Sequence, residues 1–278
     1  MSERREREAS SEREASSERE ASSERGPSGP APQAPRAESM SERVYFRQLL
    51  AGRDYARDDT IARQMVNFVY FVGDRDTREV FLVDPAYRVA ELVDLAAADG
   101  YHVTGVLATH YHADHCGGAI MGHHVEGLRD LLELDGVSAP VHVQRDEAEW
   151  VKRTTGLSDS DLALHDGGDV IPVGGVPITL LHTPGHTPGS QCFLVDWRLV
   201  AGDTLFLDGC GRTDLPGSDP DAMYESLTQR LARVPDTTML YPGHFYSAEP
   251  SATMGATRER NVVFRVPNLA VWRRFMGA

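Results

Sequence analysis

The chain has 278 residues, of which 41% are hydrophobic and 25% charged, so it is long enough to bury one sizeable core. Its formal net charge at pH 7 is −14 and no basic stretch stands out, which argues against a nucleic-acid partner. No apolar run approaches the roughly 18 to 20 residues of a membrane-spanning helix, and the charged N-terminus lacks the apolar segment of a signal peptide, so we expect neither a membrane protein nor an exported one.

The first 40 residues differ in composition from the rest of the chain. Residues 9–14 read Ala-Ser-Ser-Glu-Arg-Glu, the same six recur over residues 15–20, and the repeat begins again at Ala21. Such a repeat has no apolar face to bury, and several prolines follow it. We therefore predict a disordered low-complexity tail over residues 1–40 and one folded catalytic domain over residues 41–278.

From Val44 onward the pattern alternates between strands and helices. Residues 65–72 and 79–84 are apolar and strand-like, with a turn between them, which predicts a β-hairpin. Residues 90–98 have helical spacing and stop before Gly100. Residues 103–107 then form a short apolar strand, and the loop beyond it begins with Thr109 and His110. Loops beyond strand ends are where α/β sheets commonly carry their functional residues.

Three later strands end in the same way. Residues 176–181, 198–201 and 238–241 are strand-like, and each is followed by a turn that contains glycine or proline. His186, Asp203 and His244 come directly after these turns. Together with the loop after residues 103–107, the pattern predicts four strand ends that deliver polar side chains to one site.

The polar residues at these four strand ends are all of types that bind metals. They are His110, His112, Asp114, His115, His186, Asp203 and His244. Imidazole nitrogens and carboxylate oxygens suit zinc and iron, and this set can hold one or two ions with room for a water molecule. The sequence therefore indicates a metalloenzyme. Asp84, at the end of an earlier strand, is a candidate to support the loop that begins at His110.

This combination of motifs resembles the metallo-β-lactamase superfamily. The matching features are His-x-His-x-Asp-His from His110, Thr-Pro-Gly-His ending at His186, Asp203 and His244, and the resemblance extends over residues 44–261. It implies an α/β fold, the αββα sandwich of two mixed sheets with flanking helices, and a metal centre at one edge. His182 lies outside the implied ligand set, because the family ligand is the histidine after Pro-Gly.

The resemblance also implies how the ligands divide between two zinc ions. The first ion is assigned to His110, His112 and His186, the second to Asp114, His115 and His244, and the bridge between them to Asp203. Two such ions share a water, lower its pKa and present hydroxide to a carbonyl carbon, so no protein nucleophile is needed. Asp114 is the expected catalytic residue, which orients the hydroxide or relays a proton.

The branch of the family is indicated by the segment after Asp203. Gly-Asp-Thr-Leu-Phe from Gly202, followed by Gly-Cys-Gly-Arg-Thr-Asp from Gly209, resembles the glyoxalase II and persulfide dioxygenase branches. Both branches act on thiol-linked small molecules. We predict a metal-dependent hydrolase of thioesters of a low-molecular-weight thiol, glyoxalase II-like. The alternative is a persulfide dioxygenase with one iron, held by His110 or His112 together with His186 and Asp203.

Several other residues have two readings. Arg212 is a candidate substrate residue that either clamps a substrate carboxylate or pairs with Asp214, and Tyr246 beside His244 is a second candidate. His123 and His124 are expected to be loop residues rather than ligands. The three cysteines cannot all pair, and they lack Cys-x-x-Cys spacing, which favours a reducing cytoplasm. The sequence leaves the oligomeric state open.

Overall fold

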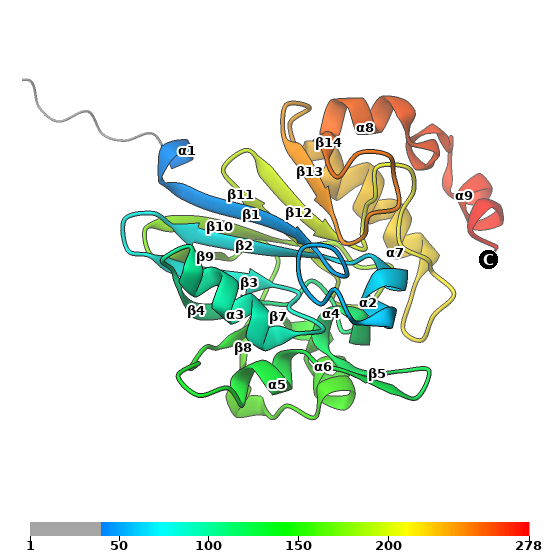
Figure 1. Cartoon of the computed structure of the whole chain (residues 1–278). Coiled ribbons are helices and arrows are strands. Elements are labelled where there is room, and N and C mark those ends of the chain that lie inside the picture. The colour runs from blue at the N-terminus through cyan, green and yellow to red at the C-terminus, as the bar shows by residue number, and fades with distance from the viewer. Residues whose placement is uncertain (1–39, 278) are drawn as a thin grey trace, which may run out of the picture. The chain divides into compact units, whose positions relative to one another are not determined.

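The computed structural model describes residues 40–277 of the chain (Figure 1). The predicted tail over residues 1–40 therefore lies, except for Met40, outside the described residues. None of the helices between Met40 and Gly277 is long and apolar enough to cross a membrane.

The first sheet has six strands and is mixed. In spatial order they are β1 (Val44–Leu50), β2 (Phe68–Asp74), β3 (Glu79–Val83), β4 (His102–Leu107), β7 (Val141–Gln144) and β8 (Leu162–His165). β1, β2 and β3 pair in antiparallel fashion, whereas β3, β4, β7 and β8 run parallel to one another. The parallel strands bring their carboxyl ends, and the loops that follow, to one edge of the sheet.

The second sheet also has six strands. Their spatial order is β14 (Ala252–Thr253), β13 (Met239–Pro242), β12 (Arg198–Gly202), β11 (Gln191–Val195), β10 (Val176–His182) and β9 (Val170–Val173). Only β12 and β13 are parallel, so Asp203 and His244 leave the sheet at the same edge. A separate small hairpin, β5 (Gly118–Ile120) and β6 (His123–Val125), follows the first ligand loop.

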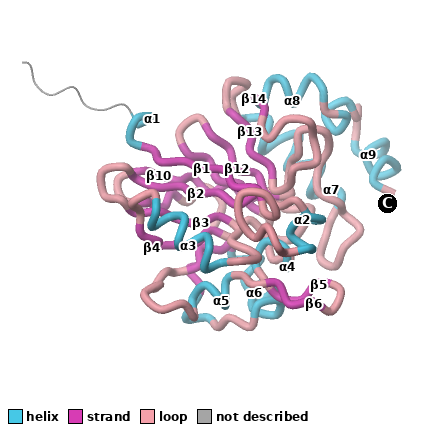
Figure 2. Tube along the Cα trace, viewed as in Figure 1, coloured by secondary structure: helices cyan, strands magenta, loops and turns pink. Residues whose placement is uncertain are grey.

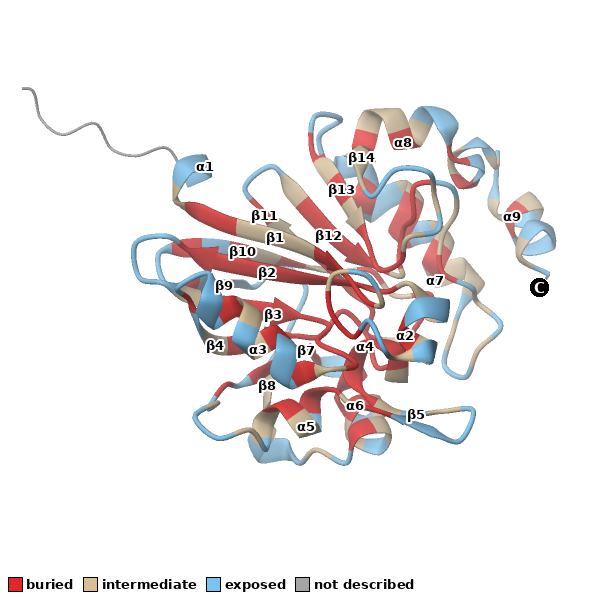
Figure 3. Cartoon of the chain, in the orientation of Figure 1, coloured by how far each residue is buried: buried red, intermediate tan, exposed pale blue. Residues whose placement is uncertain are grey.

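Helices cover the outer face of each sheet (Figures 1 and 2). The helices are α1 (Met40–Arg43), α2 (Thr60–Met65), α3 (Val89–Ala98), α4 (Ala113–Cys116), α5 (Leu128–Leu132), α6 (Ala148–Thr155), α7 (Pro220–Glu225), α8 (Met254–Arg260) and α9 (Leu269–Met276). Apolar side chains of α3, α5 and α6 pack on the first sheet, and those of α7, α8 and α9 on the second. A third core lies between the sheets (Figure 3). The expected αββα sandwich is confirmed.

One predicted strand begins later than expected. Residues 65–72 were expected to be extended, but Met65 ends α2 and Val66 adopts a left-handed conformation with φ 49°. Asp59 caps this short helix, because its carboxylate accepts hydrogen bonds from the N–H groups of Ile61 and Ala62. The strand therefore starts at Phe68, and the cap is a local signal that outweighs the apolar pattern.

Asp74 joins the two sheets at the end of β2. Its side chain is fully buried, and it accepts hydrogen bonds from the Arg43 guanidinium at 2.6 Å and from the Gly175 N–H, in the β9–β10 turn, at 2.6 Å. Burial opposes ionisation of this carboxyl group, but Arg43 and the N–H donors lower the pKa of Asp74 to about 2. The carboxylate is therefore charged at neutral pH and stabilises the fold.

We predict that Asp74→Asn lowers the free energy of unfolding by about 1–3 kcal/mol at pH 7. Because the folded pKa is depressed, this contribution is complete above the unfolded pKa of about 3.9 and is lost as pH falls toward 2. Urea denaturation at pH 7 and at decreasing pH measures it. Asp94→Asn is the control for loss of a carboxylate, since Asp94 is exposed on α3. If the difference in unfolding free energy between wild type and Asp74→Asn does not shrink toward acid pH, the stabilising role of the charged Asp74 carboxylate is contradicted.

Candidate metal centre

Four loops at one edge of the sandwich carry the seven predicted ligands. His110 and His112 follow β4, Asp114 and His115 lie on α4, His186 follows β10, Asp203 follows β12 and His244 follows β13. Five of the seven residues are buried, and the remaining two, His112 and Asp203, are partly buried. The structure thus brings together every side chain that the sequence singled out for the centre.

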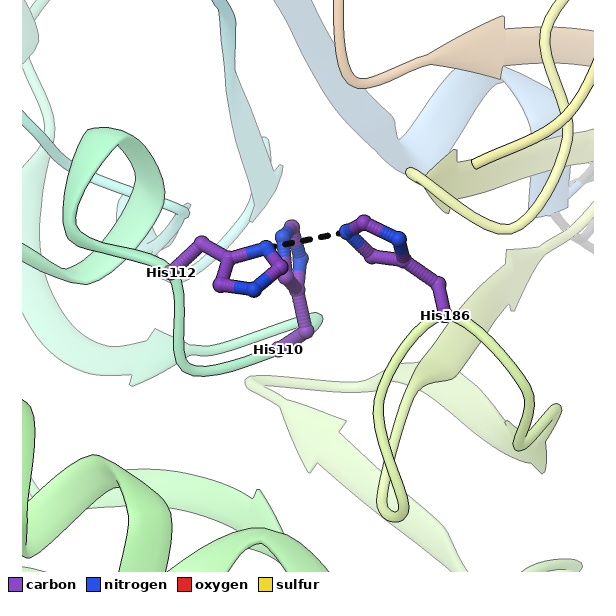
Figure 4. Close-up of side chains that lie close together, drawn as sticks. All are labelled: His110, His112 and His186. Atoms are coloured by element: carbon purple, nitrogen blue, oxygen red, sulfur yellow. Dashed lines mark hydrogen bonds between the residues drawn. The ribbon is translucent and has the colours of Figure 1, made fainter. Parts of the chain in front are cut away.

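His110, His112 and His186 form one potential ligand cluster. One nitrogen atom from each ring lies within 4.8 Å of the others. Figure 4 shows the three rings converging from two different loops, with a dashed line between His112 and His186. The distance from His186 Nε2 to His112 Nδ1 is 2.9 Å. Burial and His186 lower the pKa of His112 to about 4, and burial with neighbouring histidines holds the pKa of His110 well below its usual value. His110 and His112 are therefore neutral at pH 7, as metal binding requires.

Asp114, His115 and His244 form a second cluster with the same spread of ligand atoms. The Nε2 atoms of His115 and His244 lie 3.2 Å apart, and His244 Nε2 lies 3.4 Å from Asp114 Oδ2. Burial works against protonation of His115, but Asp114 and the neighbouring Asp203 raise its pKa to about 10. A cation and a proton therefore compete for the His115 nitrogen.

Asp203 lies between the two clusters. Its Oδ1 is 3.4 Å from His115 Nε2, and its Oδ2 is 3.7 Å from His186 Nε2 and 3.3 Å from His244 Nε2. Burial opposes its ionisation, but His244 and His115 hold the pKa of Asp203 well below its usual range. A charged carboxylate that faces both clusters suits a bridging ligand.

Two buried atoms at the centre have no hydrogen-bond partner among residues 40–277, namely His110 Nε2 and Asp203 Oδ1. An unpaired buried polar atom costs about 1–3 kcal/mol, so natural proteins seldom leave one without a partner. Cations held by the two clusters would satisfy both atoms. The nitrogen and oxygen donor set therefore fits one or two divalent ions such as zinc or iron.

Hydrogen bonds to the outer nitrogens orient the ligand rings. His115 Nδ1 lies 3.0 Å from Asp84, His186 Nδ1 lies 2.8 Å from the Arg212 carbonyl, and His244 Nδ1 lies 2.7 Å from the Met65 carbonyl. Such contacts fix the tautomer and leave the inner Nε2 free to bind a metal.

Asp84 supports the first ligand loop as the sequence suggested. Its carboxylate accepts hydrogen bonds from both the N–H and the hydroxyl group of Thr109, at 2.7 and 2.6 Å. The Thr109 hydroxyl in turn lies 2.9 Å from His110 Nδ1. This carboxylate therefore contacts the loop at both His110, through Thr109, and His115.

Sequence reasoning missed Asn67 in this centre. Its side-chain amide donates to Asp114 Oδ2 at 3.1 Å and lies 3.2 Å from His115 Nε2, while its carbonyl oxygen accepts from the Tyr87 hydroxyl. Asn67 lies one residue before β2, within the segment 65–72 that the sequence analysis assigned to a strand. The left-handed residue Val66 turns the chain there, so the Asn67 side chain points to the metal centre. No motif in the sequence marks that turn.

A cavity of about 660 Å³ opens onto both clusters. Its wall is largely apolar, with contributions from Met65, Ile120, Phe206, Leu215 and Tyr246. The space admits a small organic molecule with apolar portions.

Both candidate substrate residues, Arg212 and Tyr246, line this cavity. Arg212 forms a two-pronged ion pair with Asp214 at 2.6 Å, yet both side chains are more than half exposed. Exposed pairs of this kind are weak, so Arg212 remains able to exchange its partner for a substrate carboxylate. The Tyr246 ring stacks on the His244 ring with centroids 4.6 Å apart, and more than half of the Tyr246 surface is exposed.

The remaining histidines and cysteines that the sequence raised lie outside the two clusters. His123 and His124 are exposed on the β5–β6 hairpin, where His124 contacts Asp130. His182 Nε2 faces the Pro188 carbonyl. Cys116 is fully buried, and its thiol donates to the His110 carbonyl, so it is a packing residue.

The chain is similar to metal-dependent proteins of known families. The sequence model of the metallo-beta-lactamase superfamily matches residues 63–244. The chain is 29% identical over 201 residues to the probable polyketide biosynthesis zinc-dependent hydrolase BaeB of Bacillus velezensis, covering 72% of this chain and 82% of that protein. It is 28% identical over 234 residues to the human mitochondrial persulfide dioxygenase ETHE1, covering 80% and 84% of the two chains.

Two further similarities complete the comparison. The chain is 34% identical over 184 residues to hydroxyacylglutathione hydrolase of Nitrosococcus oceani, covering 65% of this chain but only 62% of that enzyme. In three dimensions it resembles the crystal structure of ETHE1 from Myxococcus xanthus, with a TM-score of 0.67, 27% identity and coverage of 84% of this chain and 90% of that one. Identities to hydrolases and dioxygenases are thus similar.

Proposed function

This chain belongs to the metallo-beta-lactamase superfamily, and we propose that it is a zinc-dependent hydrolase of thioesters formed by a low-molecular-weight thiol. The observation that carries the proposal is Asp203, which faces two complete three-ligand clusters and so suits a centre of two ions. The similarity to a zinc-dependent hydrolase and to hydroxyacylglutathione hydrolase supports it.

In the proposed reaction, water adds to the acyl carbon, the carbon–sulfur bond breaks, and a carboxylic acid and a thiol are released. Two zinc ions bound at the clusters would supply an activated water and stabilise charge on the carbonyl oxygen and on the leaving thiolate. Asp114 is placed to orient the water and to carry its proton toward the leaving sulfur, because Asn67 fixes the Asp114 carboxylate at the second cluster.

The cavity wall supports a small thiol-linked substrate. Ile120, Phe206 and Leu215 offer apolar contacts to the acyl chain or to the carbon skeleton of the thiol. Arg212 at the rim is available to a carboxylate, and Tyr246 covers the His244 ring. We also propose that the protein acts in the cytoplasm without a nucleic-acid partner, which is consistent with its three unpaired cysteines and its net charge of −14.

A second candidate is a persulfide dioxygenase with one iron. The similarity to human ETHE1 favours it, and the iron would be held by His186, Asp203 and His110 or His112. In the structure His186 Nε2 lies 3.7 Å from Asp203 Oδ2, which suits ligands of one ion. The two reactions differ in whether oxygen is consumed, so one pair of assays separates them.

We expect zinc-loaded protein to release free thiol from at least one of three thioesters: S-lactoylglutathione, acetyl-coenzyme A and S-acetyl-N-acetylcysteamine. A thiol-reactive dye measures the release. In parallel, iron-loaded protein is given glutathione persulfide in an oxygen electrode, where we expect no uptake. Stoichiometric oxygen uptake with no thioester turnover would establish the dioxygenase instead. If protein with verified metal content shows neither thiol release nor oxygen uptake, both candidates are contradicted.

A further inference from the structure

Glu147 is a buried carboxylate that the proposed reaction does not use. It is 1% exposed and ends a short 3₁₀ turn, Arg145–Glu147, that directly follows β7. Because β7 is the parallel neighbour of β4, this turn lies beside the loop that carries His110 and His112. A buried carboxylate is costly unless several donors satisfy it, so its partners indicate why it is there.

The donors to Glu147 come from two ligand loops. Oε1 accepts the N–H of Tyr111 at 2.7 Å, and Oε2 accepts the N–H of Gly189 at 2.6 Å. The Thr187 hydroxyl is engaged elsewhere, with the Ser190 hydroxyl at 2.7 Å. Tyr111 stands between His110 and His112, while Gly189 lies three residues after His186. One carboxylate therefore joins the loop of the first sheet to the loop of the second.

Packing around Glu147 keeps both loops close to it. A Cβ atom added at Gly189 would lie 2.5 Å from the Glu147 Cβ and from its backbone nitrogen, so glycine is needed for this approach. On the other side, the Tyr111 ring stacks on Trp150 of α6 with centroids 5.0 Å apart. The Tyr111 hydroxyl also donates to the Pro216 carbonyl at 2.8 Å. Glu147 thus holds the backbone of the first loop at Tyr111, and Trp150 of α6 holds the Tyr111 ring.

We propose that Glu147 is a positioning residue of the first metal cluster, which holds the His110–His112 loop and the His186 loop at the separation that one cation requires. It makes no hydrogen bond to the three histidines; it acts through the N–H groups of Tyr111 and Gly189. The role depends on the metal cluster and is independent of whether the protein hydrolyses thioesters or oxidises persulfides.

The substitution Glu147→Gln separates positioning from simple space filling. The amide side chain has the shape of the carboxylate, but its NH₂ group must face either the Tyr111 N–H or the Gly189 N–H, where a donor meets a donor. One of the two loops therefore loses its attachment while the side-chain volume is kept. Glu149→Gln is the matched control, because Glu149 lies on the adjacent helix and is largely exposed.

The test measures zinc affinity by competition with a chromophoric chelator and follows cobalt binding by its visible absorption. For folded Glu147→Gln we expect one of two ions to bind about 10–100-fold more weakly, a loss typical of residues that orient metal ligands. The second ion should keep its affinity, and Glu149→Gln should match the wild type. Folded Glu147→Gln that binds both ions with wild-type affinity would overturn the proposal, even if its melting temperature falls.

A second variant covers the case in which Glu147→Gln does not fold. Glu147→Asp keeps the charge and both accepting oxygens, but its side chain is one methylene shorter, so it cannot reach the Tyr111 and Gly189 N–H groups together. We expect this variant to bind the same ion several-fold more weakly, and unchanged affinity for that ion would contradict the positioning role. Because this test measures metal binding, failure of every thioester assay would contradict the proposed reaction and leave the positioning role of Glu147 unaffected.

Discussion

Asp203→Asn is expected to reduce kcat/KM by more than about 1,000-fold, which corresponds to about 4 kcal/mol of lost transition-state stabilisation. Asp203 is the only side chain among the seven predicted ligands that faces both clusters, at 3.4 Å from His115 and 3.7 Å from His186. Asparagine keeps the size of the side chain but carries no charge, so it offers two cations far less attraction. We expect the variant to lose at least one ion as well as activity.

The measurement combines thiol release with metal analysis of the same preparation. His112→Ala should behave similarly, because it removes one of only three ligands of the first cluster. Asp94→Asn is the control for loss of a carboxylate, since Asp94 lies on the exposed side of α3. Full turnover by Asp203→Asn with two bound ions would show that this carboxylate does not bridge the centre.

Removal of the metal is expected to abolish activity and to lower the melting temperature by about 10 °C. An ion present at 1,000 times its dissociation constant stabilises a folded protein by about 4 kcal/mol. For a domain of this size each kcal/mol corresponds to about 2–4 °C. In the metal-free protein the orphaned His110 Nε2 and Asp203 Oδ1 are left buried, so stability should fall.

Calorimetry before and after chelation measures this shift, and added zinc should restore both the melting temperature and the activity. Magnesium is the control ion: it prefers octahedral oxygen ligands, so a centre dominated by histidine should not respond to it. A chelated protein, shown to be metal-free, that melts at the same temperature as the loaded one would contradict a metal centre at these clusters.

Local sequence patterns revealed much of the candidate site because its residues stand next to strand ends. The strand over residues 103–107 predicted where His110 would emerge, and the turns before His186, Asp203 and His244 did the same for the other loops. Hydrophobic patterning of this kind depends on neighbours along the chain, so it can be read without tertiary contacts. The αββα sandwich itself was an implication of the family resemblance, and the structure confirms it.

The sequence by itself therefore determined the types of the seven candidate ligands, their order and the strand ends that deliver them. Only the tertiary structure decided how these residues gather into two clusters around Asp203, and which other groups hold them. Three side chains form hydrogen bonds to residues distant in sequence: Asn67 bonds to Asp114, Glu147 to Gly189, and Asp74 to Gly175. Such bonds form only when strands, loops and sheets that are distant in sequence pack together, and no periodicity within a single segment indicates which buried carboxylate or amide will meet which loop.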